Sequence, residues 1–355
     1  MTKVLMTGNA AIGEAAIRAG CQCYFGYPIT PQNELTEYMA ANLGRKPGCT
    51  FIQAESEIAA INMVYGASVA GARAMTSSSS PGISLKQEGL SYLAACQLPG
   101  VIVNMSRGGP GLGSISAAQS DYFQATRGGG HGDYHLIVFG PSSVQELADL
   151  THRAFETSDK YLVPVMILGD GMLGQMMEPV EFKHQAPTRL PVRADALRGA
   201  KGRPSRFVRT FTSNPSELEE VNWSLFRRYQ LIQKDETSYE CYKVEDAKLI
   251  ITAFGIGARI AKGAIRQARA DGLKVGMFRP ITLWPFPQQQ LKELAKNTRY
   301  FLDFEMNMGQ MIDDVRLSLE GQGDVSFYGR PGGVIPTPTE VLRVISRIYY
   351  QKGLN

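Results

Sequence analysis

The chain contains few cysteines, and their spacing does not suit a metal ion or a cluster. Five cysteines stand at positions 21, 23, 49, 96 and 241 of 355 residues, without a Cys-x-x-Cys pair. Structural zinc sites and iron–sulfur proteins bind their metal through closely spaced cysteines of that kind. We therefore expect reduced thiols in a cytoplasmic protein. Any iron–sulfur cluster that accepts electrons from this chain should lie on another chain.

Long apolar runs and a strong charge of one sign are also missing. No stretch of about 18 uncharged apolar residues is present, and the start, Met1–Thr7, lacks the apolar core of a secretory signal. The formal net charge of +4 is small for 355 residues, and no basic block with interleaved aromatic residues occurs. We expect neither a membrane nor a nucleic acid as a partner.

Glycine-rich turns are present, but none completes a nucleotide or metal signature. Gly8–Gly13 lacks the Lys-Ser/Thr of a P-loop, and Gly255-Ile-Gly257 lacks the third glycine of a dinucleotide fingerprint. Gly169-Asp-Gly171 is similar to the start of a thiamine-diphosphate magnesium motif, which needs an Asn further along for an octahedral site. The next Asn is Asn214, which is too far away. We interpret residues 169–171 as a strand-end turn, so this chain should not hold the diphosphate.

Short apolar runs alternate with helical patterns in the first 170 residues. Val4–Thr7 begins the series as a strand, and Val101–Met105 is a nearly continuous apolar run of the kind found in buried parallel strands. Ser143-Val-Gln-Glu146 has the spacing of a capping box at the start of a helix. Repeated β–α units predict an α/β fold with a doubly wound, mostly parallel sheet.

The same alternation returns near the end of the chain and predicts a second, smaller α/β domain. We place the first domain at residues 1–180 and the second at residues 247–355. Residues 181–246 are rich in Pro, Arg and polar side chains and lack a clear period. They are expected to form either a connector or a lid over the domains.

Three segments put polar side chains at the carboxyl ends of predicted strands, where ligands collect in open α/β sheets. Gly26–Pro31 would place Thr30 at the N-cap of a helix, whose free N–H groups accept anions. Glu57 enters the next helix, and Arg107 stands on a glycine-rich strand-to-helix turn, where a guanidinium can bind a carboxylate. Each has an ordinary explanation as well: a helix cap for Thr30, a helix-dipole partner for Glu57 and a surface side chain for Arg107.

Together with other motifs, these segments resemble the α subunit of 2-oxoacid:ferredoxin oxidoreductases, above all the 3-methyl-2-oxobutanoate (branched-chain) and 2-oxoglutarate members. Two positions depart from the family pattern: Ser80 stands where Gly is common, and Lys86 stands where an apolar residue is common. We expect Lys86 on the solvent face of its helix, since lysine is rarely buried unpaired. The alternative is that its ammonium reaches the pocket, where it could pair with a second carboxylate and favour 2-oxoglutarate. The motifs, in order along nearly the whole chain, are Tyr27-Pro-Ile-Thr-Pro31, Gln53-x-Glu-x-Glu57-x-Ala-Ala60, Thr76 followed by Pro81-Gly82 and Glu88, Arg107-Gly-Gly-Pro110, Gly130-His-Gly-Asp133, Glu305-Met-Asn-Met-Gly-Gln310 and Arg330-Pro-Gly-Gly333.

The resemblance implies a domain that binds the pyrimidine of thiamine diphosphate, followed by a transketolase C-terminal-like domain. The cofactor would be shared with a β subunit that carries the diphosphate-binding domain and Mg²⁺. Iron–sulfur clusters would lie on partner subunits, which include γ and ferredoxin-like chains. Glu57 is implied as the catalytic residue, hydrogen-bonded to N1′ of the cofactor. Pro28 and Ile29 would contact the cofactor with Glu57, while Thr30 and Arg107 would bind the substrate carboxylate.

The implied reaction is the oxidative decarboxylation of a 2-oxoacid, with 3-methyl-2-oxobutanoate as the first candidate. Coenzyme A would take up the acyl group and ferredoxin the electrons. A 2-oxoglutarate-specific enzyme, a lipoamide-linked 2-oxoacid dehydrogenase component and a non-catalytic scaffold remain as alternatives. The residues leave open the subunit stoichiometry, the coenzyme A contacts and the role of residues 181–246.

Overall fold

The first domain is built on a mostly parallel sheet. The computed structural model describes residues 3–184, 190 and 193–354 of the chain. In the main sheet the strand order is β13-β7-β8-β5-β4-β2-β3, and β6 pairs with β5 away from this row. The strands are β2 (Cys23–Gly26), β3 (Thr50–Gln53), β4 (Ala74–Ser78), β5 (Gly100–Gly108), β6 (Ser114–Ala117), β7 (Ile137–Phe139), β8 (Pro164–Asp170) and β13 (Thr282–Trp284).

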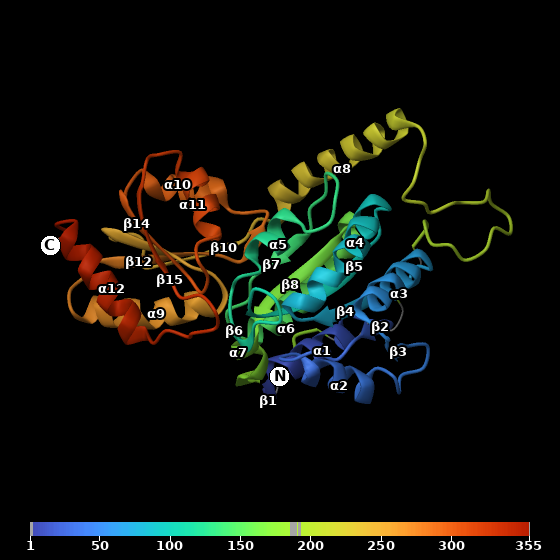
Figure 1. Ribbon diagram of the computed structural model, residues 1–355, viewed down its shortest axis with the longest axis horizontal. Helices are drawn as coiled ribbons and strands as arrows, with labels where there is room; N and C mark the ends of the chain where they lie inside the picture. Colours follow the sequence, from blue (N-terminus) through green and yellow to red (C-terminus); the bar gives the residue numbers. More distant parts are fainter. Residues whose placement is uncertain (1–2, 185–189, 191–192, 355) are drawn as a thin grey trace.

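Helices cover both faces of this sheet, as the predicted doubly wound fold requires. Helix α1 packs on α2 and α6, whereas α3 packs on α4 (Figure 1). This grouping follows from right-handed crossovers, because the β2–β3 and β7–β8 connections run one way along the sheet and the β3–β4 and β4–β5 connections run the other way. The helices are α1 (Gly8–Arg18), α2 (Asn33–Asn42), α3 (Glu57–Val69), α4 (Ser80–Ala95), α5 (Tyr122–Arg127), α6 (Val144–Tyr161) and α7 (Gly171–Gln175).

The first predicted strand lies outside the parallel sheet. Residues Val4–Thr7 form β1, which pairs antiparallel with β9 (Met177–Val180) in a sheet of its own. The side chains of Val4 and Leu5 are exposed, whereas every residue of β5 and of β8 is buried. This short segment therefore forms a separate antiparallel pair, in which Met6 and Val180 pack against a small apolar cluster of α1 and α6, and the prediction that it begins the parallel series is wrong.

The second domain contains a five-stranded sheet in the order β10-β12-β11-β14-β15. Four of its strands are parallel, as the predicted α/β class requires, and β10 adds an antiparallel edge strand beside β12. The strands are β10 (Tyr239–Tyr242), β11 (Leu249–Thr252), β12 (Val275–Pro280), β14 (Tyr300–Glu305) and β15 (Asp324–Gly329), and the helices are α9 (Gly255–Ala270), α10 (Gln288–Ala295), α11 (Met311–Leu319) and α12 (Pro338–Gln351).

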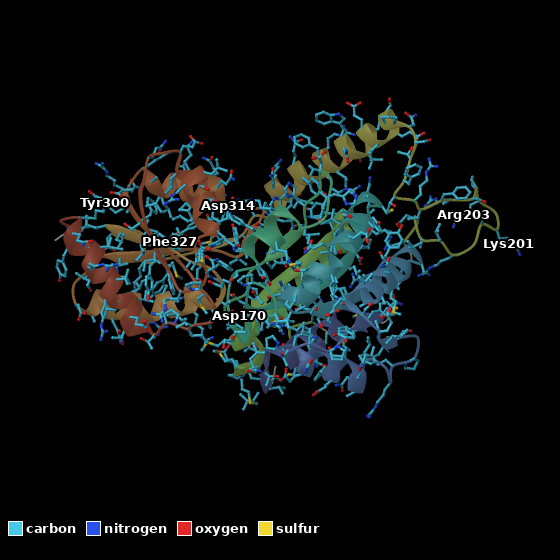
Figure 2. The ribbon with its side chains drawn as sticks, viewed as in Figure 1. Asp170, Lys201, Arg203, Tyr300, Asp314 and Phe327 are labelled. Carbon is cyan, nitrogen blue, oxygen red and sulfur yellow. The ribbon has the colours of Figure 1, made fainter. Side chains whose placement is uncertain are left out.

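The range 181–246 contains a long helix in addition to irregular chain. Helix α8 (Pro215–Glu236) runs along the first domain, and the segment before it projects away from the body of the molecule (Figure 1). Lys201 and Arg203 lie on that projecting segment (Figure 2). No helix of the described residues is both long and apolar enough to cross a membrane.

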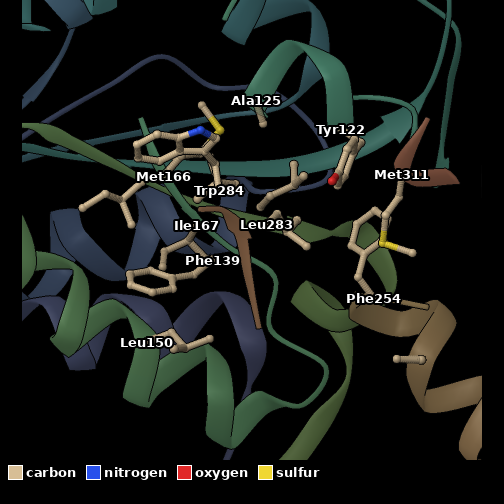
Figure 3. Packing of buried hydrophobic residues seen from close by; sticks show 14 of the residues in the cluster. Tyr122, Ala125, Phe139, Leu150, Met166, Ile167, Phe254, Leu283, Trp284 and Met311 are labelled. Carbon is tan, nitrogen blue, oxygen red and sulfur yellow. The ribbon is translucent and has the colours of Figure 1, made fainter. Parts of the chain in front are cut away.

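The two domains are joined by packing and by hydrogen bonds. Strand β13 comes from the second part of the chain, yet it pairs with β7 of the main sheet. Tyr122, Phe254, Leu283 and Met311 pack together at this junction (Figure 3). The Tyr122 hydroxyl donates to Asp314 at 2.6 Å, so α5 and α11 are bound directly. The segment that leads into α5 is therefore held from both sides.

Candidate active site

Four strand ends converge where the chain reverses its direction across the sheet. Strands β2 and β4 are neighbours, but the chain leaves β2 towards the β3 edge and leaves β4 towards β5. Such a switch point leaves a crevice between the two connections, and ligands of open α/β sheets bind there. The segments after β2, β3 and β4 include Thr30, Glu57 and Ser80, and Arg107 lies near the carboxyl end of β5.

Glu57 lies buried at the start of α3. Ser56 caps the helix, because its hydroxyl accepts the Ala59 N–H at 3.2 Å. The Glu57 side chain is 6% exposed, and no described residue donates a hydrogen bond to its carboxylate. A buried carboxylate without a donor is costly, so a bound group is the natural partner for it.

Gly82 explains how a carboxylate fits at this place. A Cβ atom at position 82 would lie 2.6 Å from Glu57 Oε1 and 2.0 Å from Ser78 Oγ. Any side chain there would collide with both groups. Glycine at position 82 thus allows the first turn of α4 to approach the Glu57 carboxylate.

Lys86 is fully buried, so the expectation that it faces solvent is wrong. It lies one turn after Gly82 on α4 and has 0% exposure. Its ammonium donates to Thr76 Oγ1 at 3.1 Å, and no described carboxylate lies within 4.0 Å. Burial lowers the pKa of Lys86 to about 8, and attraction to Glu57 opposes this shift. The helix face that carries Gly82 and Lys86 packs against α3 and the sheet, which the helical spacing alone did not reveal.

Thr30 and Arg107 are brought together, although neither has the local structure that was predicted. Arg107 Nη1 donates to the Thr30 carbonyl at 2.8 Å and to its hydroxyl at 3.4 Å. Thr30 is not an N-cap: the Gln32 N–H donates to the Ile29 carbonyl at 3.2 Å, and this turn delays the start of α2 until Asn33. The pair still joins the end of β2 to the end of β5.

Arg107 lies in a strand, not on a strand-to-helix turn. Its backbone pairs with Ala117 of β6, so β5 continues to Gly108 and is followed by a second strand. The guanidinium is 7% exposed, and its Nη2 donates to the Leu112 carbonyl at 3.0 Å. Its Nε is buried and has no partner among the described residues. The Arg107 guanidinium therefore connects the loop after β2 with the loop after β5. Its Nε–H remains a donor without an acceptor among the described residues.

Asp121 belongs to the site, although no motif or spacing in the sequence pointed to it. Its Oδ2 accepts from Ser80 Oγ at 2.6 Å and from Asn104 Nδ2 at 2.8 Å. Ser80 Oγ also accepts the Arg107 N–H at 3.0 Å. Burial raises the pKa of Asp121, and the hydrogen bonds from Ser80 and Asn104 oppose the shift. The hydroxyl that replaces a common glycine at position 80 was the one available signal, and it ties α4 to β5.

Several buried donors at these strand ends have no partner among the described residues. They are the hydroxyls of Ser78 and Ser79, together with Arg107 Nε. Most buried polar groups in proteins are hydrogen-bonded, so a cluster of orphaned ones indicates a place where another molecule binds. Ser78 and Ser79 adjoin the place where Gly82 and Glu57 approach each other.

Asp170 has a capping role at the end of β8. Its Oδ1 accepts the N–H groups of Met172 and Leu173, each at 3.0 Å, and so caps α7. Residues 169–171 lie at a strand end, as predicted, but β8 passes directly into α7 without a separate turn. Burial raises the pKa of Asp170 to about 6. The residue lies where the two domains meet (Figure 2). Within the described ranges, no group of three or more His, Cys, Asp and Glu side chains is arranged to hold a metal ion.

Comparison with known proteins relates both parts of the chain to one family. Residues 14–240 match the model described as pyruvate flavodoxin/ferredoxin oxidoreductase, thiamine diphosphate-binding, and residues 247–341 match that of pyruvate:ferredoxin oxidoreductase core domain II. The chain is 48% identical to ketoisovalerate oxidoreductase subunit VorB of Methanothermobacter marburgensis, over 98% of each chain. It is 36% identical to 2-oxoglutarate synthase subunit KorA of Methanothermobacter thermautotrophicus, over 96% of this chain and 97% of the other.

A solved structure has the same fold. It is the 2-oxoglutarate:ferredoxin oxidoreductase from Magnetococcus marinus with 2-oxoglutarate, coenzyme A and succinyl-CoA bound, with a TM-score of 0.85 and 26% identity. The match covers 98% of this chain but 65% of that longer chain. The predicted α/β class is confirmed. The names of these relatives do not favour the lipoamide-linked or the scaffold alternative.

Lys86→Met should stabilise the fold at neutral pH. The folded-state pKa is about 8 and the ordinary value is 10.5, so burying the charged form is unfavourable below pH 8. We expect the free energy of unfolding at pH 7 to rise by about 1–3 kcal/mol. Between pH 8 and pH 10.5 the unfolded chain binds a proton that the folded chain lacks, so the gain should shrink over that window.

Urea unfolding at several pH values measures this effect. Lys292→Met is the control, because Lys292 pairs with Glu320 at the surface and its loss should change stability by no more than about 0.5 kcal/mol. A Lys86→Met protein that is less stable than the wild type at pH 7 would contradict the buried, charged lysine.

Proposed function

The chain belongs to the 2-oxoacid:ferredoxin oxidoreductases, which are oxidoreductases that work with partner subunits, and we propose that it binds the pyrimidine half of thiamine diphosphate. The observation that carries this proposal is the buried Glu57 carboxylate beside Gly82, where the chain itself supplies no hydrogen-bond donor. A pyrimidine ring nitrogen that carries a proton is the donor such a carboxylate lacks. Orphaned hydroxyls at Ser78 and Ser79 fit the polar edge of the same ring.

A partner subunit would complete the site. Large apolar side chains on these segments are exposed, and exposed apolar surface of this kind marks protein interfaces. They come from α3, α4, the β5–β6 connection and β6. We propose that a β subunit covers this surface and brings the diphosphate-binding domain and Mg²⁺. The clusters that pass electrons to ferredoxin would lie on γ and ferredoxin-like chains. The exposed side chains are Ile58, Leu85, Leu112 and Ile115.

Each residue has a defined task in this proposal. When bound, thiamine diphosphate supplies the carbon nucleophile for the keto group and takes up the electron pair released with CO₂. Glu57 exchanges a proton with N1′ of the pyrimidine, which makes the 4′-amino group a usable base. Pro28 and Ile29 border the same ring. Arg107, with Thr30 held against it, binds the carboxylate beside the keto carbon. Coenzyme A would accept the acyl group once two electrons have passed to the clusters of the partner subunits and on to ferredoxin.

The proposed substrate is 3-methyl-2-oxobutanoate. The relatives named for ketoisovalerate are 47% and 48% identical to this chain, whereas those named for 2-oxoglutarate are at most 36% identical. We expect the purified complex, assayed with coenzyme A and a viologen acceptor, to have a higher kcat/KM for 3-methyl-2-oxobutanoate than for 2-oxoglutarate. The reverse order would assign the chain to the 2-oxoglutarate members.

Glu57→Gln should leave the complex assembled and nearly abolish turnover. An amide cannot exchange a proton with N1′, so we expect the rate of 2-oxoacid oxidation to fall about 10²-fold or more. Exchange of the cofactor C2 proton for deuterium, followed by NMR, should slow in parallel. Glu55→Gln is the matched control, because Glu55 precedes the same helix but is exposed. Slow exchange in the Glu55 variant with normal exchange in the Glu57 variant would move the role to Glu55.

Arg107→Lys should weaken the use of the 2-oxoacid and spare coenzyme A. Lysine keeps the charge but cannot bridge Thr30, Leu112 and a carboxylate at once. We expect kcat/KM for the oxoacid to fall by about tenfold to a hundredfold. Arg73→Lys is the control, since Arg73 binds Asp159 at 2.7 Å and lies at the start of β4, the opposite end of the sheet. Weaker coenzyme A binding with unchanged oxoacid kinetics would assign Arg107 to a phosphate site instead.

A further inference from the structure

Lys86 places a buried positive charge behind the catalytic carboxylate. Gly82 and Lys86 are four residues apart on α4 and therefore lie on one face of the helix. A Cβ atom at Gly82 would lie 2.6 Å from Glu57 Oε1, and Lys86 follows one turn later on the same buried face. One of the three ammonium N–H groups of Lys86 donates to Thr76, and the other two have no partner among the described residues. The charge is thus held close to Glu57 without being neutralised.

The charged groups around α4 single out Glu57 as the anion that acts on Lys86. Attraction to Glu57 of α3 raises the pKa of Lys86, against a larger lowering by burial. Strand β4 contributes the neutral Thr76 hydroxyl. Asp121 and Arg107 are bound to Ser80 at the first residue of the helix. The neighbouring Gln87 turns towards the Gly129 N–H, at 3.1 Å.

We propose that Lys86 is a positioning residue that acts through Glu57: its ammonium stabilises the Glu57 carboxylate, which is the form that accepts a hydrogen bond from a protonated N1′. The inference rests on the proposed function of Glu57 and adds a second residue to it. A lysine in this place disfavours folding at neutral pH, and a stabilising structural role does not explain it. A cation behind the carboxylate favours the tautomer of the aminopyrimidine that carries its proton on N1′.

The proposed role of Lys86 can be measured because it depends on the positive charge of the ammonium group, which changes with pH. The charge is present below about pH 8 and is lost above it. In the assembled complex loaded with thiamine diphosphate and Mg²⁺, the near-ultraviolet circular dichroism band of the imino tautomer reports the proton on N1′ without any turnover. For the wild type we expect this band to decline as the pH rises through about 8.

Three variants test the role of the charge. Lys86→Met and Lys86→Gln should reduce the band about tenfold at pH 7 and remove its step near pH 8, because neither side chain is charged. Lys86→Arg should keep the band and also lose the step, because a guanidinium stays protonated. Thr76→Val is the matched control: it removes the hydrogen-bond partner of Lys86 but leaves the ammonium, so both the band and the step should remain.

A double-mutant cycle separates action through Glu57 from a general effect. Lys86→Met should weaken the affinity of the complex for thiamine diphosphate about tenfold, and it should cause no further loss in the Glu57→Gln background. An unchanged band in assembled Lys86→Met and Lys86→Gln complexes, or equal losses in both backgrounds, overturns the proposal. If Glu57→Gln also retains the band, the proposed function of Glu57 fails as well. If Glu57→Gln alone removes it, only the role of Lys86 is lost.

Discussion

The burial of the Glu57 carboxylate at the junction of α3 and α4 is the constraint on which the rest of the site depends. Three features make this burial possible. Ser56 caps the helix, Gly82 has no side chain, and Lys86 supplies a positive charge from the same face of α4. A serine cap is ordinary, but glycine and a buried lysine would be odd choices in an ordinary helix pair, since both disfavour folding. Together these features accommodate the Glu57 carboxylate between α3 and α4.

The second domain contributes to this pocket without reaching Glu57. Gln119 exchanges two hydrogen bonds with the backbone of Met306, at 3.1 and 3.0 Å, and Gln310 donates to the Ser120 carbonyl at 2.8 Å. These contacts hold the segment immediately before Asp121. Asp121 itself accepts hydrogen bonds from Ser80 and Asn104 of the first domain. The loop after β14 thus fixes the segment that orients α4 and Arg107. The domain that matches core domain II is a support for the first domain.

Sequence periodicity predicted most of the fold because burial in this protein follows strand and helix periods. The buried run of β5 and the parallel strands of the second domain are examples. The predictions that are wrong concern residues whose burial or local structure depends on contacts with parts of the chain that are distant in sequence. Lys86 was expected in solvent because the spacing of residues along a helix does not reveal which of its faces pack against other elements. Thr30 was made an N-cap because a turn closed by Gln32 could not be seen in the residue pattern.

The candidate site was predicted in part for the same physical reason. The strands that carry or precede Thr30, Glu57 and Arg107 all end at one edge of the sheet. Topology alone therefore brings these three residues near each other. Asp121 follows the short edge strand β6, and it reaches the site only because a loop of the other domain holds its segment.

A division of labour between subunits follows from what this chain buries and what it exposes. Its polar groups, Glu57, Lys86 and Arg107, are enclosed, whereas the apolar Ile58 and Leu85 on the same two helices are open to solvent. In an enzyme that worked alone, we would expect the apolar side chains on these two helices to be buried and the polar groups to be open to the substrate. Under the proposed function, Glu57 and Lys86 are already in place before assembly, and the exposed apolar side chains beside them would contact the β subunit. Water would then be excluded from Glu57 and the cofactor pyrimidine only in the complex, so the proposed chemistry would belong to the complex.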